Sequence, residues 1–155
     1  LLSLHGIGLG DAGAAALAAA LSHGALPKLE ELHISSNQLG DEGLAALAGP
    51  LRRRPGLNTL YLSGNRIGDP GVAALVDNLG DKELKQLKTL DMQDSQVGDA
   101  GCAILTAAID GAMLPALTRG DFGTHPVDGN PASDAAKQAV RDAVLANEAR
   151  RAGAS

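Results

Sequence analysis

Short segments in which apolar and polar residues alternate recur along the chain. In each segment two apolar side chains fall on the same face, and the pairs are Leu2 and Leu4, Leu32 and Ile34, Leu60 and Leu62, and Leu90 and Met92. Alternation with a period of two predicts a β-strand with one buried face. We therefore expect four short strands, at residues 2–4, 32–34, 60–62 and 90–92.

A run rich in alanine and leucine follows each alternating segment. In the second run Gly43, Leu47 and Leu51 are spaced four apart, and the same spacing recurs in the runs that start at Gly13, Gly71 and Gly101. Residues four apart share one face of an α-helix. Each run is therefore predicted to be a helix that turns its leucines towards the strands.

An aspartate stands at the start of each predicted helix. Asp11, Asp41, Asp69 and Asp99 follow one another at intervals of 30, 28 and 30 residues, and self-similarity at such a period is typical of a solenoid. An aspartate in this place predicts an N-cap for its own helix. We interpret the glycine two residues later as a position where helix and strand approach closely.

One strand and one helix in constant order predict a parallel sheet with right-handed crossovers. Strands stand about 4.8 Å apart, whereas packed helices need about 8 to 10 Å, so the stack must curve with its strands on the inner side. The pattern Leu29-x-x-Leu32-x-Ile34-x-x-Asn37-x-Leu39-Gly40-Asp41-x-Gly43 resembles a leucine-rich repeat of the ribonuclease-inhibitor-like type. The resemblance implies an α/β solenoid with a concave parallel sheet and convex helices, and a scaffold that binds other proteins.

The repeats divide the chain into three parts. Residues 1–116 are predicted to form four regular leucine-rich repeats, the first truncated at its start, and residues 117–150 an irregular fifth repeat with a capping helix that begins near Ser133. Residues 151–155 are expected to be a tail. The asparagine of the repeat motif is present as Asn37 and Asn65, is replaced by Ile7 and Ser95, and returns at Asn130.

Composition narrows the possible partners and the compartment. A net charge of −5 and a pI of about 5.2 provide no basic surface of the kind that nucleic-acid-binding proteins carry. Because Cys102 is the only cysteine, no intrachain disulfide can form, which favours a reducing compartment, in the cytoplasm or an organelle interior. No apolar run approaches the length of a membrane span.

The register of the strands predicts which side chains line the concave face. One row is Ser3, His33, Tyr61 and Asp91, a second is His5, Ser35, Ser63 and Gln93, and a third is Glu31, Thr59 and Thr89. We predict a partner-binding site formed by Tyr61, His33, Asp91, Ser35, Ser63, Gln93 and His5. Tyr61 is its centre, because it is the only tyrosine and offers a large contact area with a polar tip. The alternative is that Tyr61 only fits the pleated surface and that contact runs through the helices or the ends.

Catalytic, metal and cofactor sites are not expected. His5 and Ser35 would be neighbours, but Asp91 would lie roughly 10 Å or more from either imidazole, too far to orient it. His5, His33 and Glu31 on an open sheet do not predict a closed metal site. The basic run Arg52-Arg53-Arg54 is interpreted as a solvated helix end, with docking to an acidic partner as the alternative.

These observations predict a non-catalytic scaffold or accessory subunit of a larger assembly that binds a protein partner. The alternatives are a regulator of a small GTPase, by resemblance to Ran GTPase-activating proteins, and a spacer between larger subunits. Leu2 and Leu4 lie on an open strand without a capping unit. We therefore expect the N-terminal edge to be covered by further repeats or by another subunit.

Overall fold

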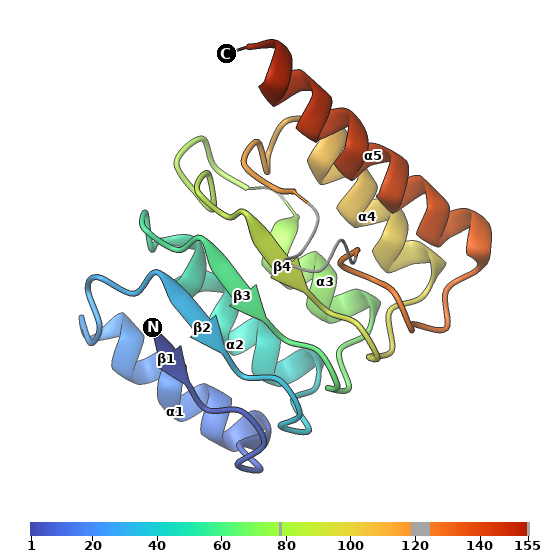
Figure 1. Cartoon of the computed structure of the whole chain (residues 1–155). Coiled ribbons are helices and arrows are strands. Elements are labelled where there is room, and N and C mark those ends of the chain that lie inside the picture. The colour runs from blue at the N-terminus through green and yellow to red at the C-terminus, as the bar shows by residue number, and fades with distance from the viewer. Residues whose placement is uncertain (78, 119–124, 155) are drawn as a thin grey trace.

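The computed structural model describes residues 1–77, 79–118 and 125–154 and contains one parallel sheet with a row of helices on one side of it (Figure 1). The strands are β1 (Leu2–Ser3), β2 (Glu31–His33), β3 (Thr59–Tyr61) and β4 (Thr89–Asp91), and they lie in the order β1-β2-β3-β4. All three pairings are parallel, as predicted. From β2 onward each strand begins one residue before the predicted segment.

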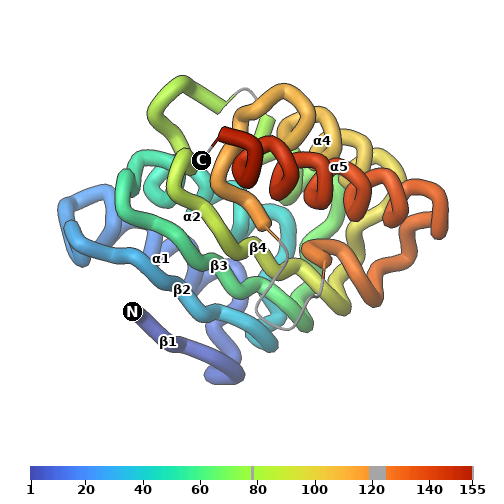
Figure 2. Tube along the Cα trace, turned by 45° about the horizontal axis from the view of Figure 1, so that its top comes forward, coloured from blue at the N-terminus to red at the C-terminus, as the bar shows by residue number. Residues whose placement is uncertain are grey.

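The helices are α1 (Gly10–Ser22), α2 (Asp41–Arg52), α3 (Asp69–Val76), α4 (Asp99–Asp110) and α5 (Asp134–Gly153). Each helix packs on the next one along the chain, and Figure 2 shows the strands side by side, with α4 and α5 at the C-terminal end of the stack. α3 ends at Val76, so Leu79 lies beyond the helix in which the spacing placed it, although its side chain still packs against the core.

The core is a layer of aliphatic side chains between the sheet and the helices. The inward residues of three successive strands, Leu32, Leu60 and Leu90, are at most 3 % exposed, as are Leu47, Leu75 and Leu105 of the helices behind them. The alternation and the four-residue spacing therefore identified the two sides of this layer correctly. Each unit buries its apolar face only by stacking on its neighbours, which is why stability accumulates along the chain.

The aspartates connect successive units and do not cap their own helices. Asp41 Oδ1 accepts hydrogen bonds from the backbone N–H groups of Gly68 (2.7 Å) and Gly71 (2.9 Å), at the start of the following helix. Asp11 does the same at Gly40 and Gly43, Asp69 at Gly98, and Asp99 at Ser133. The prediction of N-caps within each helix was therefore wrong, because the carboxylate satisfies donors one unit further on.

The second glycine at the start of α2, α3 and α4 leaves room for the carboxylate of the preceding unit. A Cβ atom on Gly71 would lie 2.7 Å from Asp41 Oδ1, and one on Gly101 would lie 2.5 Å from Asp69 Oδ1. Neither separation leaves room for a carbon atom. The close approach that the glycine permits is thus to the preceding aspartate, and not to a strand as the sequence suggested.

Buried asparagines form a second connection between units. Asn65 Oδ1 accepts from the N–H groups of Asn37 and Leu39 (both 2.9 Å), and its Nδ2 donates to the carbonyls of Ile34 (3.0 Å) and Leu62 (2.7 Å). Asn37 makes the equivalent bonds to the first unit, at Leu4, Ile7 and Leu9. In the fourth unit Ser95 takes this place, and its hydroxyl reaches only the carbonyl of Gln93, at 3.5 Å.

The C-terminal part continues the stack and covers its end. The backbone N–H of Met92 donates to the carbonyl of Pro126 (2.8 Å), and Asn130 Oδ1 accepts from the N–H of Val97 (2.8 Å). Ser133 caps α5, as predicted, by accepting from the N–H of Ala136. Residues 119–124 of the predicted irregular repeat and residue 155 of the predicted tail lie outside the described residues. α5 ends at Gly153, beyond its predicted end at residue 150.

Candidate functional site

The middle of the open face of the sheet is a row of side chains on adjacent strands. The pairing register places His33, Tyr61 and Asp91 next to one another, with Ser3 at the edge of the row. The rings of His33 and Tyr61 meet edge to face, with centroids 4.6 Å apart and an interplanar angle of 86°. Both side chains are half-buried, so the imidazole restricts the orientations open to the tyrosine ring before any partner arrives.

The second predicted row lies beside the first. Ser63 Oγ and Ser35 Oγ are hydrogen-bonded at 3.1 Å, and the N–H of Gln93 donates to Asp91 Oδ1 at 3.0 Å. His5 is exposed at the edge of the sheet. Ser35 is only 8 % exposed, so it supports Ser63 and contributes little surface of its own.

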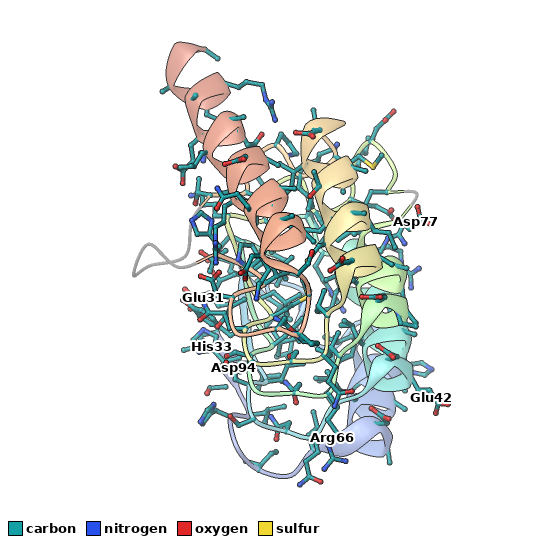
Figure 3. The ribbon with its side chains drawn as sticks, turned by 90° about the vertical axis from the view of Figure 1, so that its right-hand side faces the viewer. Glu31, His33, Glu42, Arg66, Asp77 and Asp94 are labelled. Carbon is teal, nitrogen blue, oxygen red and sulfur yellow. The ribbon has the colours of Figure 1, made fainter. Side chains whose placement is uncertain are left out.

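The open face of the sheet is acidic. Glu31 Oε2 lies 3.5 Å from His33 Nε2, a contact that becomes an ion pair when the imidazole is protonated. Figure 3 shows Glu31, His33 and Asp94 on the sheet side of the molecule and Glu42 and Asp77 on the opposite, helical side. The four described strands contain no lysine or arginine.

Among the described residues, the histidine and the aspartate of the central row are not in contact with each other. β3 lies between the strands of His33 and Asp91, so the carboxylate cannot orient the imidazole directly. Within residues 1–77, 79–118 and 125–154 no group of three His, Cys, Asp or Glu side chains is placed to hold a metal ion. The arrangement is a polar surface with one central aromatic ring.

Two members of the arginine run have structural contacts. Arg54 Nη2 donates to the carbonyls of Leu21 (2.5 Å) and Ala25 (2.9 Å), so it caps the C-terminal end of α1 from the neighbouring unit. Arg52 pairs with Glu83 at 2.8 Å. The pKa of Glu83 is lowered first by the hydrogen bond from the N–H of Gly80 and then by Arg52.

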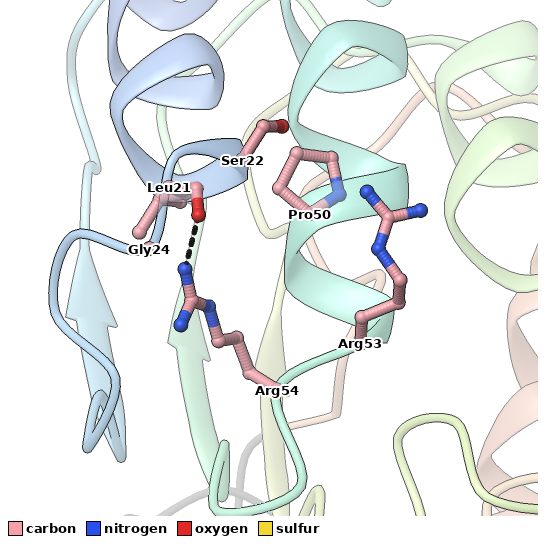
Figure 4. A pocket seen from close by; sticks show the side chains of 6 residues that line it. All are labelled: Leu21, Ser22, Gly24, Pro50, Arg53 and Arg54. Carbon is pink, nitrogen blue, oxygen red and sulfur yellow. Dashed lines mark hydrogen bonds between the residues drawn. The ribbon is translucent and has the colours of Figure 1, made fainter.

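Arg53 lies at a pocket of about 240 Å³ between the ends of α1 and α2 (Figure 4). The pocket is also lined by Ser22, Gly24 and Pro50. Arg53 is the exposed member of the run, and its charge contributes to the lowered pKa of Glu83.

The C-terminal unit contains a further ion pair and the single cysteine. Burial raises the pKa of Asp128, but the hydrogen bonds from Arg141 (2.7 Å) and from the N–H of His125, together with the charges of both residues, outweigh it and hold the pKa below its usual value. Burial, followed by the negative charges of Asp99 and Asp69, raises the pKa of the Cys102 thiol. At neutral pH Cys102 is therefore a protonated core side chain and a poor nucleophile.

The sequence did not predict which residues form hydrogen bonds between neighbouring units. Besides the aspartates and Arg54, Asn147 of α5 is 3 % exposed and donates to the carbonyls of Leu114 (3.1 Å) and Leu117 (2.8 Å). An asparagine among the apolar positions of a helix is the one sequence signal that marks it, because a buried amide needs partners.

Two of three comparisons with known proteins give a match. Residues 25–48, 57–76 and 85–103 match the family model of the leucine-rich repeat. The comparison with curated proteins found no match. Among solved structures the chain is similar to "Leiomodin-1 Actin-Binding Site 2 (ABS2)", with a TM-score of 0.68 and 13 % sequence identity over 98 % of this chain and 82 % of that chain.

At 13 % sequence identity, the similarity to this solved structure is evidence for the fold alone. In the part of the chain that the structure describes, no helix combines the length and apolar character needed to cross a membrane. The matched segments, the parallel sheet and its row of helices show that the chain contains three leucine-rich repeats and has the fold of a leucine-rich-repeat solenoid.

Proposed function

We propose that this protein is a non-catalytic protein-binding module, a scaffold or accessory subunit of a larger assembly, and that it contacts its partner through the concave sheet around Tyr61. The observation that carries the proposal is the row formed by His33, Tyr61 and Asp91 in the middle of the sheet. The fold supports it as well, because leucine-rich repeats generally mediate protein–protein interaction.

The chemistry of the row favours a partner segment with a lysine or arginine side chain. The ring face of Tyr61 attracts a cation, and Asp91 on the next strand supplies the opposite charge. The ring is already held by His33, so little conformational entropy is lost when a partner packs on it.

A photo-crosslinker placed at position 61 and, in a separate variant, at Glu42 on the helical side would identify the contacting protein and the face that it uses. Titration of that purified protein should then show a loss of about 2 kcal/mol or more of binding for Tyr61→Ala. Glu42→Ala is the matched control and should bind like the parent. If Tyr61→Ala also binds like the parent, the concave face is not the interface.

Arg53 tests the competing location near the ends of the helices. Arg53→Ala should change the association rate and its salt dependence more than the affinity, because an exposed rim charge mainly steers encounter. A loss of affinity with Arg53→Ala and none with Tyr61→Ala would move the interface to the pocket between α1 and α2.

Actin is a defined first protein to titrate, because the similar solved structure is named as an actin-binding site. The alternative function, regulation of a small GTPase, has only the fold in its favour. A GTP-hydrolysis assay with a panel of small GTPases tests it, and accelerated hydrolysis would support it.

The repeat length of 28 to 30 residues supports the ribonuclease-inhibitor-like type, and the single buried Cys102 supports a location in the cytoplasm or an organelle interior.

A further inference from the structure

A cation and a carboxylate from successive units pair near the C-terminal ends of α2 and α3. Arg52 Nε and Nη2 donate to Glu83 Oε2 at 3.1 Å and 2.8 Å. Both side chains are partly buried, at 19 % and 28 % exposed. Hydrogen bonds between ionised groups are stronger than neutral ones, and partial burial shields them from solvent. This boundary therefore shows which acceptor an arginine binds at this edge of the stack.

One unit earlier, a cation stands in the place of that carboxylate. Glu83 lies six residues before β4, and Arg53 lies six residues before β3, with which β4 is paired from its first residue. Arg53 is exposed, and within residues 1–77, 79–118 and 125–154 its guanidinium has no hydrogen bond or ion pair. Its charge acts on Glu83 only through space. The N–H donors of Arg53 can therefore bind another acceptor.

The place of the cation has no side chain in the first unit. Arg52 lies seven residues before β3, and Gly24 lies seven residues before β2, with which β3 is paired from its first residue. A Cβ atom on Gly24 would meet nothing within 4 Å. The boundary between α1 and α2 thus has a cation where the next boundary has a carboxylate, and only a glycine opposite it.

A second guanidinium lines the hollow that results (Figure 4). Nη2 of Arg54 donates to the carbonyls of Leu21 and Ala25, which fixes the side chain in place, and its Nε and Nη1 have no partner in the part of the chain that the structure describes. The hollow measures about 240 Å³, and none of the described residues that line it is acidic. It holds a carboxylate group with room for water, whose share of liquid volume is about 30 Å³ per molecule.

The helix ends limit the charge of the anion that fits. The carbonyls at the end of a helix carry a charge of roughly −0.5, which opposes a second negative group. Arg54 offsets this charge at α1, because it donates directly to the carbonyl of Leu21. A singly charged carboxylate is therefore favoured over a phosphate dianion, and a guanidinium matches a carboxylate with two donors, as Arg52 does with Glu83.

We propose that the hollow between the ends of α1 and α2 is a binding site for an acidic segment of a partner protein, whose aspartate or glutamate carboxylate lies between Arg53 and Arg54. The contact repeats in trans what Arg52 and Glu83 form within the chain. The site lies at the ends of the helices and not on the open face of the sheet. It therefore does not depend on the interface proposed around Tyr61.

The first experiment supplies the carboxylate from the protein itself. Ser22 is exposed and lines the hollow at the end of α1. Ser22→Glu should unfold at a higher denaturant concentration than the uncharged control Ser22→Gln, although a negative charge at a helix C-terminus is by itself unfavourable. When Arg53→Gln is added to both, this advantage should disappear or reverse, because a double-mutant cycle isolates the contact between the two side chains.

The second experiment titrates hexaglutamate into the native protein at about 10 mM ionic strength and follows the backbone amides by NMR. The amides of Ser22, Gly24 and Arg53 should shift. Arg53→Gln should weaken binding by about five-fold, the upper end of what one exposed ion pair contributes. Arg66→Gln is the matched control, because Arg66 is an exposed arginine in the loop before α3, and it should bind like the parent. Inorganic phosphate at the same concentration should leave these amides nearly unshifted.

Three results would overturn the proposal. Equal losses with Arg53→Gln and Arg66→Gln would mean that only net charge matters. An advantage of Ser22→Glu that survives Arg53→Gln would mean that no carboxylate contacts Arg53. Saturation by inorganic phosphate at a lower concentration than by hexaglutamate would mean that the hollow selects a phosphate.

Discussion

Replacing Asn65 by alanine should lower the free energy of unfolding by about 3 to 5 kcal/mol. The side chain is 5 % exposed and makes four hydrogen bonds of 2.7 to 3.0 Å to the backbone. Alanine would leave the N–H groups of Asn37 and Leu39 buried without their acceptor, at a cost of about 1 to 3 kcal/mol each. The carbonyls of Ile34 and Leu62 would lose a donor as well.

Guanidinium unfolding, followed by circular dichroism at 222 nm, measures this loss. Asn58→Ala is the matched control, because the side chain of Asn58 is half-buried and accepts one hydrogen bond, from Thr59 Oγ1 at 2.9 Å. The control should cost less than about 1 kcal/mol. A solenoid can lose units separately, so equal denaturant slopes in parent and variant are required before free energies are compared.

A difference of less than about 1 kcal/mol between Asn65→Ala and Asn58→Ala would refute the reasoning, because it would mean that water satisfies the exposed backbone groups at little cost. The reverse change is available in the same chain. Ser95→Asn would place an acceptor near the N–H groups of Asn65 and Ile67, and it should stabilise the fold by about 1 kcal/mol in the same assay. A loss of stability would show that the turn of the fourth unit cannot accommodate the amide.

Three further outcomes are expected. Gly71→Ala should destabilise the fold by about 2 kcal/mol in the same assay, because the added Cβ would meet the carboxylate of the preceding unit. This cost outweighs the better helix propensity of alanine. Gly153→Ala is the control and should be neutral, because nothing lies within 4 Å of the added Cβ. The pKa of Asp128 is lowered from the ordinary 3.8, so this carboxylate contributes stability above that pH and loses it as the pH falls through the lowered pKa. The difference in unfolding free energy between the parent and Arg141→Ala should therefore be larger at about pH 6 than at about pH 2.5. A difference that does not change with pH would contradict this. Cys102, 1 % exposed and with a raised pKa, should react with a thiol reagent in the native protein only as fast as the fourth unit opens, and a rate equal to that of the unfolded chain would exclude the buried position.

The sequence by itself determined the repeat and the two sides of its core. Alternation at Leu60 and Leu62 and the spacing of Leu47 and Leu51 specify strand and helix locally, since only those periods put the apolar side chains on one face. Because every unit repeats the same order, the parallel pairing and the row containing Tyr61 follow from the register. The end of α3 does not, since Leu79 fits the helical spacing but lies beyond Val76.

Only the tertiary structure determined with which unit each polar side chain forms its hydrogen bonds. Asp41 stands at the start of its own helix, and the same period fits a cap within the unit and a contact with the next unit equally well. Stacking brings the start of α3 to its carboxylate, and the glycine at position 71 leaves room for it. Likewise, the sequence predicted that Arg54 belongs to a solvated helix end. In the packed structure its guanidinium instead donates a hydrogen bond to a carbonyl at the C-terminal end of α1. A repeat period fixes the spacing between units, but only the packed structure fixes which of two neighbours a side chain contacts.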